Sequence, residues 1–373
     1  MNEIRLIIAE DEKSTVEAYR DNIEAYNDEL KKENLRIIAQ FYEEAKVSSE
    51  KINNNFDAAI IDLKLKDDKS GDESGGQKLI NDIVEKLRIP TFVYTANPGL
   101  FDAIEREESV FFKKCVKAET KILSILKIIK HIYGTGITRI MGGRGLIEDK
   151  LNEIFWKHID KNLDLEELKT FSEKKLLRYI ALHLQEYLGL SESGDFENYI
   201  PAEVYIHPPI KNHIHTGDIL KKGSDDKFYI ILNPSCDMVV RSIKKIDDGK
   251  KLPVRNAEKI VLASLIKWSE LDDLSGITKE SGKDKKKRLK DHISNKKGRY
   301  HYLPPYAKLK DGMFIDFQFI GAYDPDTIES NFERVATISS VFLNNIIARF
   351  SQYYSRQGQP DFDEQQQVDY LLA

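Results

Sequence analysis

Cysteine is scarce in this chain of 373 residues. Only Cys115 and Cys236 are present, far apart in the sequence, so there is neither a disulfide framework nor the paired spacing of a zinc site. This favours a reducing, cytoplasmic compartment. The short apolar run near the start turns acidic within "MNEIRLIIAEDEK", which argues against a secretory signal, and no later run approaches the length of a membrane span. We therefore expect a soluble protein without membrane contact.

The chain also lacks a large excess of charge of either sign. Lys and Arg together number 57 against 62 Asp and Glu, which gives a net charge of −5. A global basic field of the kind that attracts nucleic acid or an anionic membrane is therefore excluded, and any such contact would be local. The length exceeds that of one ordinary hydrophobic core and predicts two or three domains.

The N-terminal part alternates short apolar runs with longer amphipathic stretches. Apolar runs typical of buried strands lie at 4–9, 35–41, 58–63, 91–96 and 110–112. Amphipathic segments separate the runs, and a last helix is predicted up to Tyr133. Continuous apolar strands that alternate with helices predict a doubly wound α/β fold with five parallel strands, over residues 1–133.

Three further segments follow. A glycine-rich linker and a helical hairpin are predicted over 134–190. Short strand-like runs with Gly, Pro and Asp between them predict a mainly β, small barrel-like domain over 191–355. A long helix from about 331 to 354 closes that domain, and 356–373 is predicted to be a polar tail.

Polar residues gather where the predicted strands of the first domain end. In open parallel sheets ligands bind at the carboxyl ends of the strands. Carboxylates that converge there would repel one another unless a cation lay among them, and oxygen-only ligands suit Mg²⁺. The residues in question are Glu10 and Asp11 after the first strand, Asp62 after the third, Thr95 at the end of the fourth, and Lys113 and Lys114 after the fifth.

A carboxylate beside a metal and a lysine can act as a nucleophile. Asp62 could attack a phosphoryl donor to give an aspartyl phosphate, while the lysine and the metal neutralise charge on the transferred oxygens. The hydroxyl of Thr95 could then donate to a phosphoryl oxygen. Taken alone, a carboxylate such as Asp62 at a strand end is more often a turn or helix-cap residue. The ordered set of residues reverses this and favours the chemical interpretation.

These motifs resemble the receiver domain of two-component response regulators, over about residues 1–133. "IIAEDE" carries the acidic pair, "DAAIIDLKL" the phospho-acceptor, "FVYTA" the switch threonine and "VFFKK" the lysine. The resemblance implies Asp62 as phospho-acceptor and Mg²⁺ held by Glu10, Asp11 and Asp62. It also implies Thr95 and Phe111 as switch residues and Lys114 as the active-site lysine, with Lys113 as the alternative. Cys115 follows where the family usually has proline.

The resemblance also implies a mode of signalling. The readout face would be the fourth helix, fifth strand and fifth helix, which could also form a homodimer. The whole chain resembles bacterial response-receiver-domain proteins found beside histidine-kinase-like ATPases in host-defence (anti-phage) neighbourhoods. Such an ATPase is therefore the expected phosphoryl donor, and no enzymatic activity is predicted beyond autophosphorylation and autodephosphorylation. The alternative is a pseudo-receiver that never takes phosphate and serves for docking.

The second half carries weaker signals. Segment 279–299 is strongly basic and is followed by tyrosines in "RYHYLPPY", a combination that could hold phosphates and stack bases, or could be a solvated loop. A nucleic-acid-binding or nuclease effector is therefore a further alternative. Metal binding by the histidines of "HPPIKNHIH" and a thiol nucleophile at Cys236 are disfavoured, because no further ligand or partner has suitable spacing. The candidate contacts are Lys285, Lys286, Lys287, Arg288, Lys296, Lys297 and Arg299.

Overall fold

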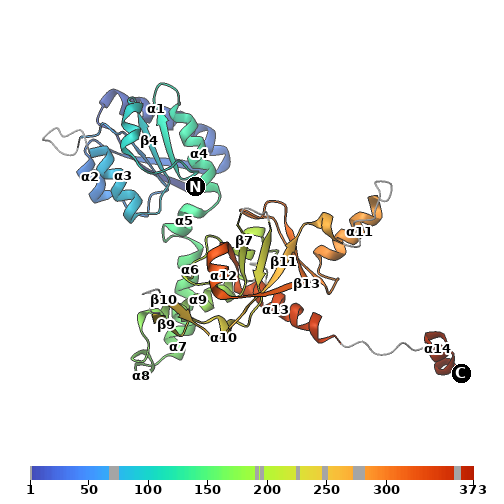
Figure 1. Ribbon diagram of the computed structural model, residues 1–373. Coiled ribbons are helices and arrows are strands. Elements are labelled where there is room, and N and C mark those ends of the chain that lie inside the picture. Colours follow the sequence, from blue (N-terminus) through green and yellow to red (C-terminus); the bar gives the residue numbers. More distant parts are fainter. Residues whose placement is uncertain are drawn as a thin grey trace. The chain divides into compact units, whose positions relative to one another are not determined.

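The computed structural model describes residues 2–66, 75–189, 193, 197–223, 227–245, 251–271, 282–356 and 363–373. The chain divides into two compact units, Met1–Phe196 and Glu197–Ala373 (Figure 1). Within the described ranges, no helix is both long and apolar enough to cross a membrane.

The first unit contains the predicted parallel sheet, with strand order β2-β1-β3-β4-β5. This is the flavodoxin-like order of a doubly wound sheet. The central strands are apolar along their whole length because helices cover both faces. The strands are β1 (Asn2–Ala9), β2 (Leu35–Tyr42), β3 (Ala58–Ile61), β4 (Thr91–Thr95) and β5 (Phe112–Val116).

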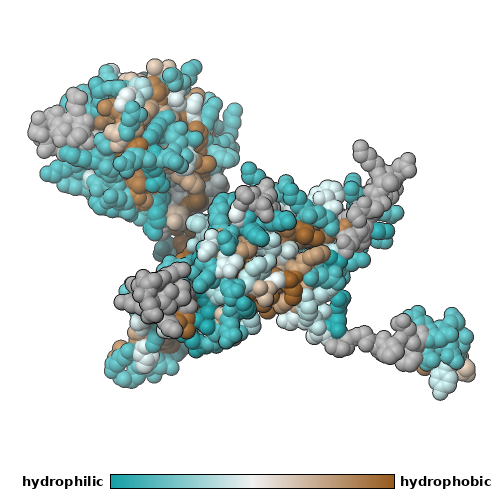
Figure 2. Space-filling model, in the orientation of Figure 1, coloured by the Kyte–Doolittle hydropathy of each residue, from teal (hydrophilic) through white to brown (hydrophobic). Residues whose placement is uncertain are grey.

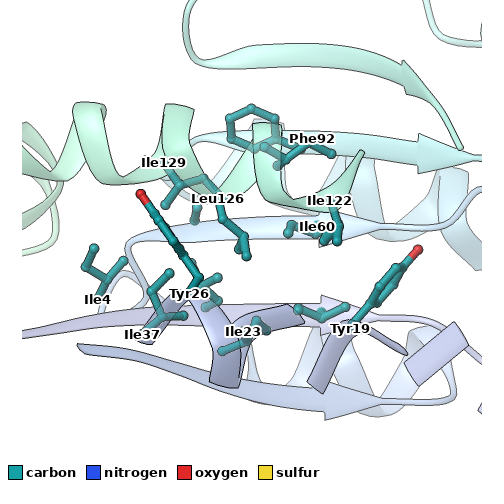
Figure 3. Close-up of a cluster of buried hydrophobic side chains, with 14 of the residues drawn as sticks. Ile4, Tyr19, Ile23, Tyr26, Ile37, Ile60, Phe92, Ile122, Leu126 and Ile129 are labelled. Carbon is teal, nitrogen blue, oxygen red and sulfur yellow. The ribbon is translucent and has the colours of Figure 1, made fainter. Parts of the chain in front are cut away.

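The two faces of this sheet have separate cores. Along β1, Leu6 and Ile8 belong to one buried cluster and Ile7 and Ala9 to the other, as the alternation of side chains in a strand requires. Helices α1 (Lys13–Leu30) and α4 (Ile122–Gly134) pack on the first face (Figure 3). Helix α3 (Gly75–Lys86) packs on the second, beside α2 (Ala45–Lys51).

Strand β5 differs from its prediction. The apolar run at 110–112 was expected to be the strand, but β5 begins at Phe112 and runs through two lysines to Val116. β5 is the edge strand of the sheet, so most of its residues are only partly buried and polar side chains are tolerated there. The expected fourth helix is also not α-helical, since β4 leads into the 3-10 helix η2 (Pro98–Ala103).

The rest of the first unit is helical. The predicted hairpin is formed by α6 (Leu146–Ile154) and α9 (Glu173–Leu188), which contact each other. The short elements around them are α5 (Ile137–Met141), the π-helical turn η3 (Phe155–Ile159), α7 (Asp160–Asn162) and α8 (Leu165–Leu168).

The second unit is built on an antiparallel sheet of seven strands in the order β12-β13-β11-β8-β7-β14-β6. The sheet curls into a half-barrel. Its two edges come together, since Tyr205 of edge strand β6 stacks on Tyr306, just beyond the other edge strand β12. Figure 2 shows apolar surface over β11 and β13. The strands are β6 (Tyr205–Ile206), β7 (Asp218–Lys222), β8 (Phe228–Ile231), β11 (Ile260–Ile266), β12 (Tyr300–Leu303), β13 (Met313–Tyr323) and β14 (Phe332–Ile338).

The C-terminal helix is shorter than predicted. Residues 332–338 form β14, and helix α13 (Ser340–Ser355) begins only after it. Val335 and Ile338 are spaced as on a helix, but they are β-branched and contribute to the core as part of the sheet. The predicted polar tail contains α14 (Glu364–Leu372).

The remaining elements of the second unit are η4 (Pro201–Val204), α10 (Ser235–Met238), β9 (Ser242–Lys245), β10 (Lys251–Val254), η5 (Trp268–Glu270), α11 (Gly282–Ile293) and α12 (Pro325–Asn331).

Candidate functional site

Acidic residues follow two neighbouring strands at the carboxyl edge of the first sheet. Glu10 and Asp11 come directly after β1, and Asp62 comes directly after β3, which is paired in parallel with β1. The backbone N–H of Asp62 donates to the carbonyl of Ala9, at 2.9 Å. Glu10 and Asp62 are both buried, with 2% and 8% of their surface exposed. Two carboxylates are therefore held beside each other in a place where an unpaired charge is costly.

A lysine lies between these two carboxylates. The Nζ atom of Lys117 donates to Oε2 of Glu10 at 2.6 Å and to Oδ2 of Asp62 at 2.7 Å. Burial disfavours the charged form of Lys117, but its hydrogen bonds to Asp62 and Glu10 outweigh this and raise the pKa. Burial also raises the pKa of Glu10, and Lys117 opposes that rise. The cluster is thus a charge-assisted, largely desolvated network.

Lys114, the lysine expected in this cluster, lies elsewhere. Its Nζ donates to the carbonyl oxygens of Phe101 and Ile104, at 3.3 and 2.9 Å, so it holds the segment around η2. The alternative, Lys113, lies within β5 as well. Because β5 extends to Val116, the first side chain beyond its end is that of Lys117, whose N–H donates to the carbonyl of Thr95 on β4. Sequence analysis ended the strand too early because it did not allow for lysines within an edge strand.

The first unit thus combines a parallel sheet of this strand order with buried carboxylates and a lysine at its carboxyl edge. The first unit is similar to response-regulator receiver domains.

Three solved receiver structures illustrate the likeness. One is the N-terminal domain of a response regulator/sensory box/GGDEF 3-domain protein from Carboxydothermus hydrogenoformans, with 14% identity over 36% of this chain and 98% of that chain, at a TM-score of 0.27. Another is the response regulator TrrA from Thermotoga maritima in complex with Mg²⁺ and BeF, with 18% identity, 35% and 99% coverage and a TM-score of 0.24. The third is a CheY-like receiver domain protein from Methanospirillum hungatei, with 16% identity, 34% and 90% coverage and a TM-score of 0.25.

No protein-family model matches the chain, and no curated protein matches it either. These three likenesses are below 25% identity and below a TM-score of 0.5. They therefore carry no argument, and the flavodoxin-like fold of this unit follows from its own strand order and connections.

The two expected switch residues of the first unit lie at opposite edges of its sheet. Thr95 is fully buried at the carboxyl end of β4, and its Oγ1 accepts a hydrogen bond from the N–H of Asn97 at 3.3 Å. Phe111 precedes β5, at the opposite end of that strand, and is 44% exposed. The expected pairing of Phe111 with Thr95 is therefore incorrect. The placement of the lysine at Lys114 rested on this assignment of Phe111, three residues earlier.

The oxygen ligands expected for Mg²⁺ are present at the carboxyl edge of the first sheet, and their chemistry suits a hard cation. As placed in the structure, these side chains do not form a complete metal site. Asp11 pairs with Lys66 at 3.4 Å, while Lys117 takes one oxygen from each of Glu10 and Asp62. Among the residues that the structure describes, no group of three acidic, His or Cys side chains is placed to hold a metal.

A glycine of α3 allows close packing against the loop that contains Asp62 and Leu63. A Cβ on Gly76 would lie 2.2 Å from the carbonyl oxygen of Asp62 and 2.7 Å from the Cα of Leu63. Real Cβ atoms do not approach backbone so closely, so only glycine allows α3 to pack against this loop. The preceding acidic and glycine-rich stretch, 67–74, lies outside the described residues.

A second buried carboxylate lies at the other end of β3. Asp57 is fully buried. One of its oxygens accepts hydrogen bonds from Oγ1 of Thr138 at 2.7 Å and from Nη2 of Arg144 at 2.8 Å, and the other from the N–H of Arg5 at 2.8 Å. Thr138 and Arg144 belong to the linker, which is thus attached to the amino edge of the sheet. Sequence analysis missed this contact.

Of the candidate nucleic-acid contacts in the second unit, Arg299 is already engaged. Its guanidinium binds the fully buried carboxylate of Asp316 through Nε at 2.9 Å and Nη2 at 2.7 Å. Lys285 lies over the ring of Trp268, and Lys296 pairs with Asp291 at 3.0 Å. The remaining candidates are Lys286, Lys287 and Arg288 in the basic helix α11, and Lys297 beyond it; all four are exposed.

The disfavoured cysteine site gains no support. Cys236 is exposed, and its Sγ lies 3.7 Å from a carboxylate oxygen of the adjacent Asp237. The two residues lie in the helical turn α10 rather than at the start of a strand. A carboxylate beside a thiol does not activate it as a base such as histidine would.

Proposed function

We propose that this protein is a phosphorylation-switched response regulator and that Asp62 accepts the phosphoryl group. The observation that supports this best is the position of Lys117, which holds Asp62 and Glu10 together at the carboxyl edge of the sheet. A partly buried ammonium that already contacts the acceptor is placed to balance the negative charge that the phosphoryl group adds.

The proposed transfer needs no other covalent chemistry from the protein. An oxygen of Asp62 attacks phosphorus, a P–O bond forms, and the bond from phosphorus to the donor breaks, so the electron pair leaves with the donor. We propose a histidine-kinase-like ATPase as donor, in which case the leaving group is an imidazole that takes up a proton. A bacterial host-defence setting is the one implied by the sequence resemblance.

Mg²⁺ is the proposed cofactor, with Asp11 as its main ligand and Asp62 and Glu10 as further ligands. It would supply charge neutralisation for the phosphoryl oxygens. Binding requires Asp11 to leave Lys66, and a partly exposed ion pair of this kind is worth at most about 1 kcal/mol. Mg²⁺ should raise the melting temperature of the unmodified protein. Asp11→Asn should remove that increase, which differential scanning calorimetry can measure.

The decisive experiment is phosphoryl labelling of the full chain. Acetyl phosphate with Mg²⁺ should add one phosphoryl group, detected by mass spectrometry as an acid-stable, base-labile adduct. Asp62→Asn should remove the adduct. Asp21→Asn, an exposed position on α1, is the control and should label normally. Labelling that survives in Asp62→Asn would refute the assignment, and failure of the unmodified protein to label would favour the docking alternative.

A further inference from the structure

The second unit has an apolar groove that its own sheet does not fill. A cavity of about 350 Å³ lies between η4, the end of β12 and the first turns of α13. Exposed apolar side chains surround it, contributed by Tyr199, Ile200, Ile293 and Val341. Apolar surface gathered from three separate segments is unusual on a monomer and marks a place where another surface packs.

The groove also contains a polar atom that lacks a partner. His301 is 6% exposed and lines the cavity, and its Nδ1 has no hydrogen-bond partner. Burial, with a smaller effect from Arg349, lowers the pKa of His301 to about 4, so the ring is neutral at neutral pH. A buried nitrogen left in this way is costly unless something supplies the missing hydrogen bond.

Helix α14 has an apolar face that no other part of the described structure covers. It has nine residues, and helices this short are not stable alone in water. Val368, Leu371 and Leu372 lie at positions i, i+3 and i+4 and so share one face. All three are exposed, by 46%, 79% and 83%. The helix therefore needs a surface on which to bury this face, and Figure 2 shows apolar as well as hydrophilic surface on it.

The charges of the two parts are complementary. Asp363, Glu364 and Asp369 are the charged residues of segment 363–372, which contains no Lys or Arg. The groove lies at the C-terminal end of the basic helix α11, where Ile293 lines it. The exposed Lys290 comes three residues before Ile293. Electrostatic attraction therefore favours this end of the groove for an acidic helix.

The chain between the two parts is long enough. Ser355 ends α13 and Glu364 begins α14, and the intervening residues can span at most about 30 Å. Helix α13 has 16 residues and is therefore about 24 Å long, so α14 can return along α13 to Val341. A short tether also gives an effective concentration of about millimolar, which favours the helix of the same chain over that of another molecule.

We propose that α14 docks in this groove of its own chain, with Val368, Leu371 and Leu372 against the apolar walls and its acidic residues toward α11. The docked helix covers the groove and the adjacent basic end of α11 together. It is an internal, displaceable ligand, so a partner that binds either surface competes with it.

Disulfide trapping in the full chain tests the contact. In a Cys115→Ala, Cys236→Ser background, Leu372→Cys is combined with Val341→Cys in the groove. The matched control combines Leu372→Cys with Val254→Cys, since Val254 is 40% exposed against 43% for Val341 and does not line the groove. An intramolecular disulfide should form at least about tenfold faster with Val341→Cys. Equal rates would refute the proposal, and so would a dimeric product, which would place the helix on a second copy.

Hydrogen exchange gives an independent measurement. The amides of 364–372 should exchange at least about tenfold more slowly than in an unstructured peptide, because docking protects them. Val341→Glu should remove this protection and Val254→Glu should retain it. If Val341→Glu unfolds the unit, Leu371→Glu removes the same contact from the exposed helix side. Unprotected amides in the unmodified chain, or protection unaffected by Leu371→Glu, would contradict docking.

Discussion

Lys117 Nζ lies 2.7 Å from Oδ2 of Asp62, although 55 residues separate them in the chain. The two side chains meet because β3 and β5 both end at the carboxyl edge of one parallel sheet, with β4 between them. Among the residues that the structure describes, the other carboxylate oxygen, Oδ1, accepts one longer hydrogen bond of 3.3 Å, from the N–H of Lys64. Within this part of the chain Oδ1 is held less firmly than Oδ2, and the proposed phosphorylation would use it as the attacking oxygen.

Replacing Lys117 should affect both stability and labelling. Lys117→Met leaves Glu10 and Asp62 buried beside each other without a cation, and removal of one partner from a buried ion pair costs about 3 kcal/mol. Urea denaturation should show this loss, and the rate of labelling by acetyl phosphate should fall by about 100-fold or more.

Lys114→Met is the matched control for that experiment. Lys114 bonds to backbone carbonyls near η2 and not to the acidic cluster, so the variant should label at close to the normal rate. A larger loss of labelling in Lys114→Met than in Lys117→Met would show that the wrong lysine has been placed in the site.

Gly76→Ala should directly disturb the loop that contains Asp62 and Leu63. The new methyl group would overlap the backbone of Asp62 and Leu63, so the loop or α3 must shift, and a loss of about 1–3 kcal/mol is expected. Gly134→Ala, where a Cβ would meet nothing within 4 Å, is the control. Denaturation and labelling of the two variants can be compared side by side, and equal behaviour would mean that α3 does not constrain the loop.

The buried contacts of Asp57 predict a measurable coupling between sheet and linker. Asp57→Asn and Arg144→Met should each destabilise the protein, because each leaves a buried polar group without its partner. In a double-mutant cycle the two should show an interaction energy of about 1–3 kcal/mol. Additive losses would mean that the ion pair contributes nothing beyond its separate parts.

His301 predicts a pH dependence with a definite sign. Its pKa is lowered from 6.5 to about 4 on folding, so the unfolded chain binds a proton in this window and the folded chain does not. The stability that neutral His301 contributes is complete above pH 6.5 and falls, by about 3 kcal/mol at most, as the pH drops to about 4.

The His301 effect is measured as a difference. The difference in unfolding free energy between the unmodified protein and His301→Gln should shift against the unmodified protein as the pH falls from 7 to 4, because glutamine does not titrate. A difference that stays constant with pH, or that shifts in favour of the unmodified protein, would contradict the lowered pKa.

Sequence analysis predicted the parallel sheet because its central strands are buried on both faces and therefore continuously apolar. It failed at the edge, where β5 contains Lys113 and Lys114 and the apolar rule no longer applies. Two errors accompanied the misplaced strand end. Lys114 was assigned to the site in place of Lys117, and Phe111 was assigned as a partner of Thr95. Burial that depends on tertiary position cannot be inferred from local composition.

The second unit shows the same limit in a different form. The spacing of Val335 and Ile338 fits a helix as well as a strand, and only pairing with β7 decides between them. The contacts of Asp57 were not predicted either, because a lone Asp before a strand is most often a turn residue and its partner Arg144 is 87 residues away.

Only the four residues of strand β3 separate two buried carboxylates, Asp57 and Asp62. It is hydrogen-bonded to β1 on one side and β4 on the other, so it can neither stretch nor buckle easily. Asp62 at one end contacts Lys117, and Asp57 at the other contacts Thr138 and Arg144 of the linker. A displacement of Asp62 along the axis of so short a strand would therefore also move Asp57 and the part of the linker that it binds.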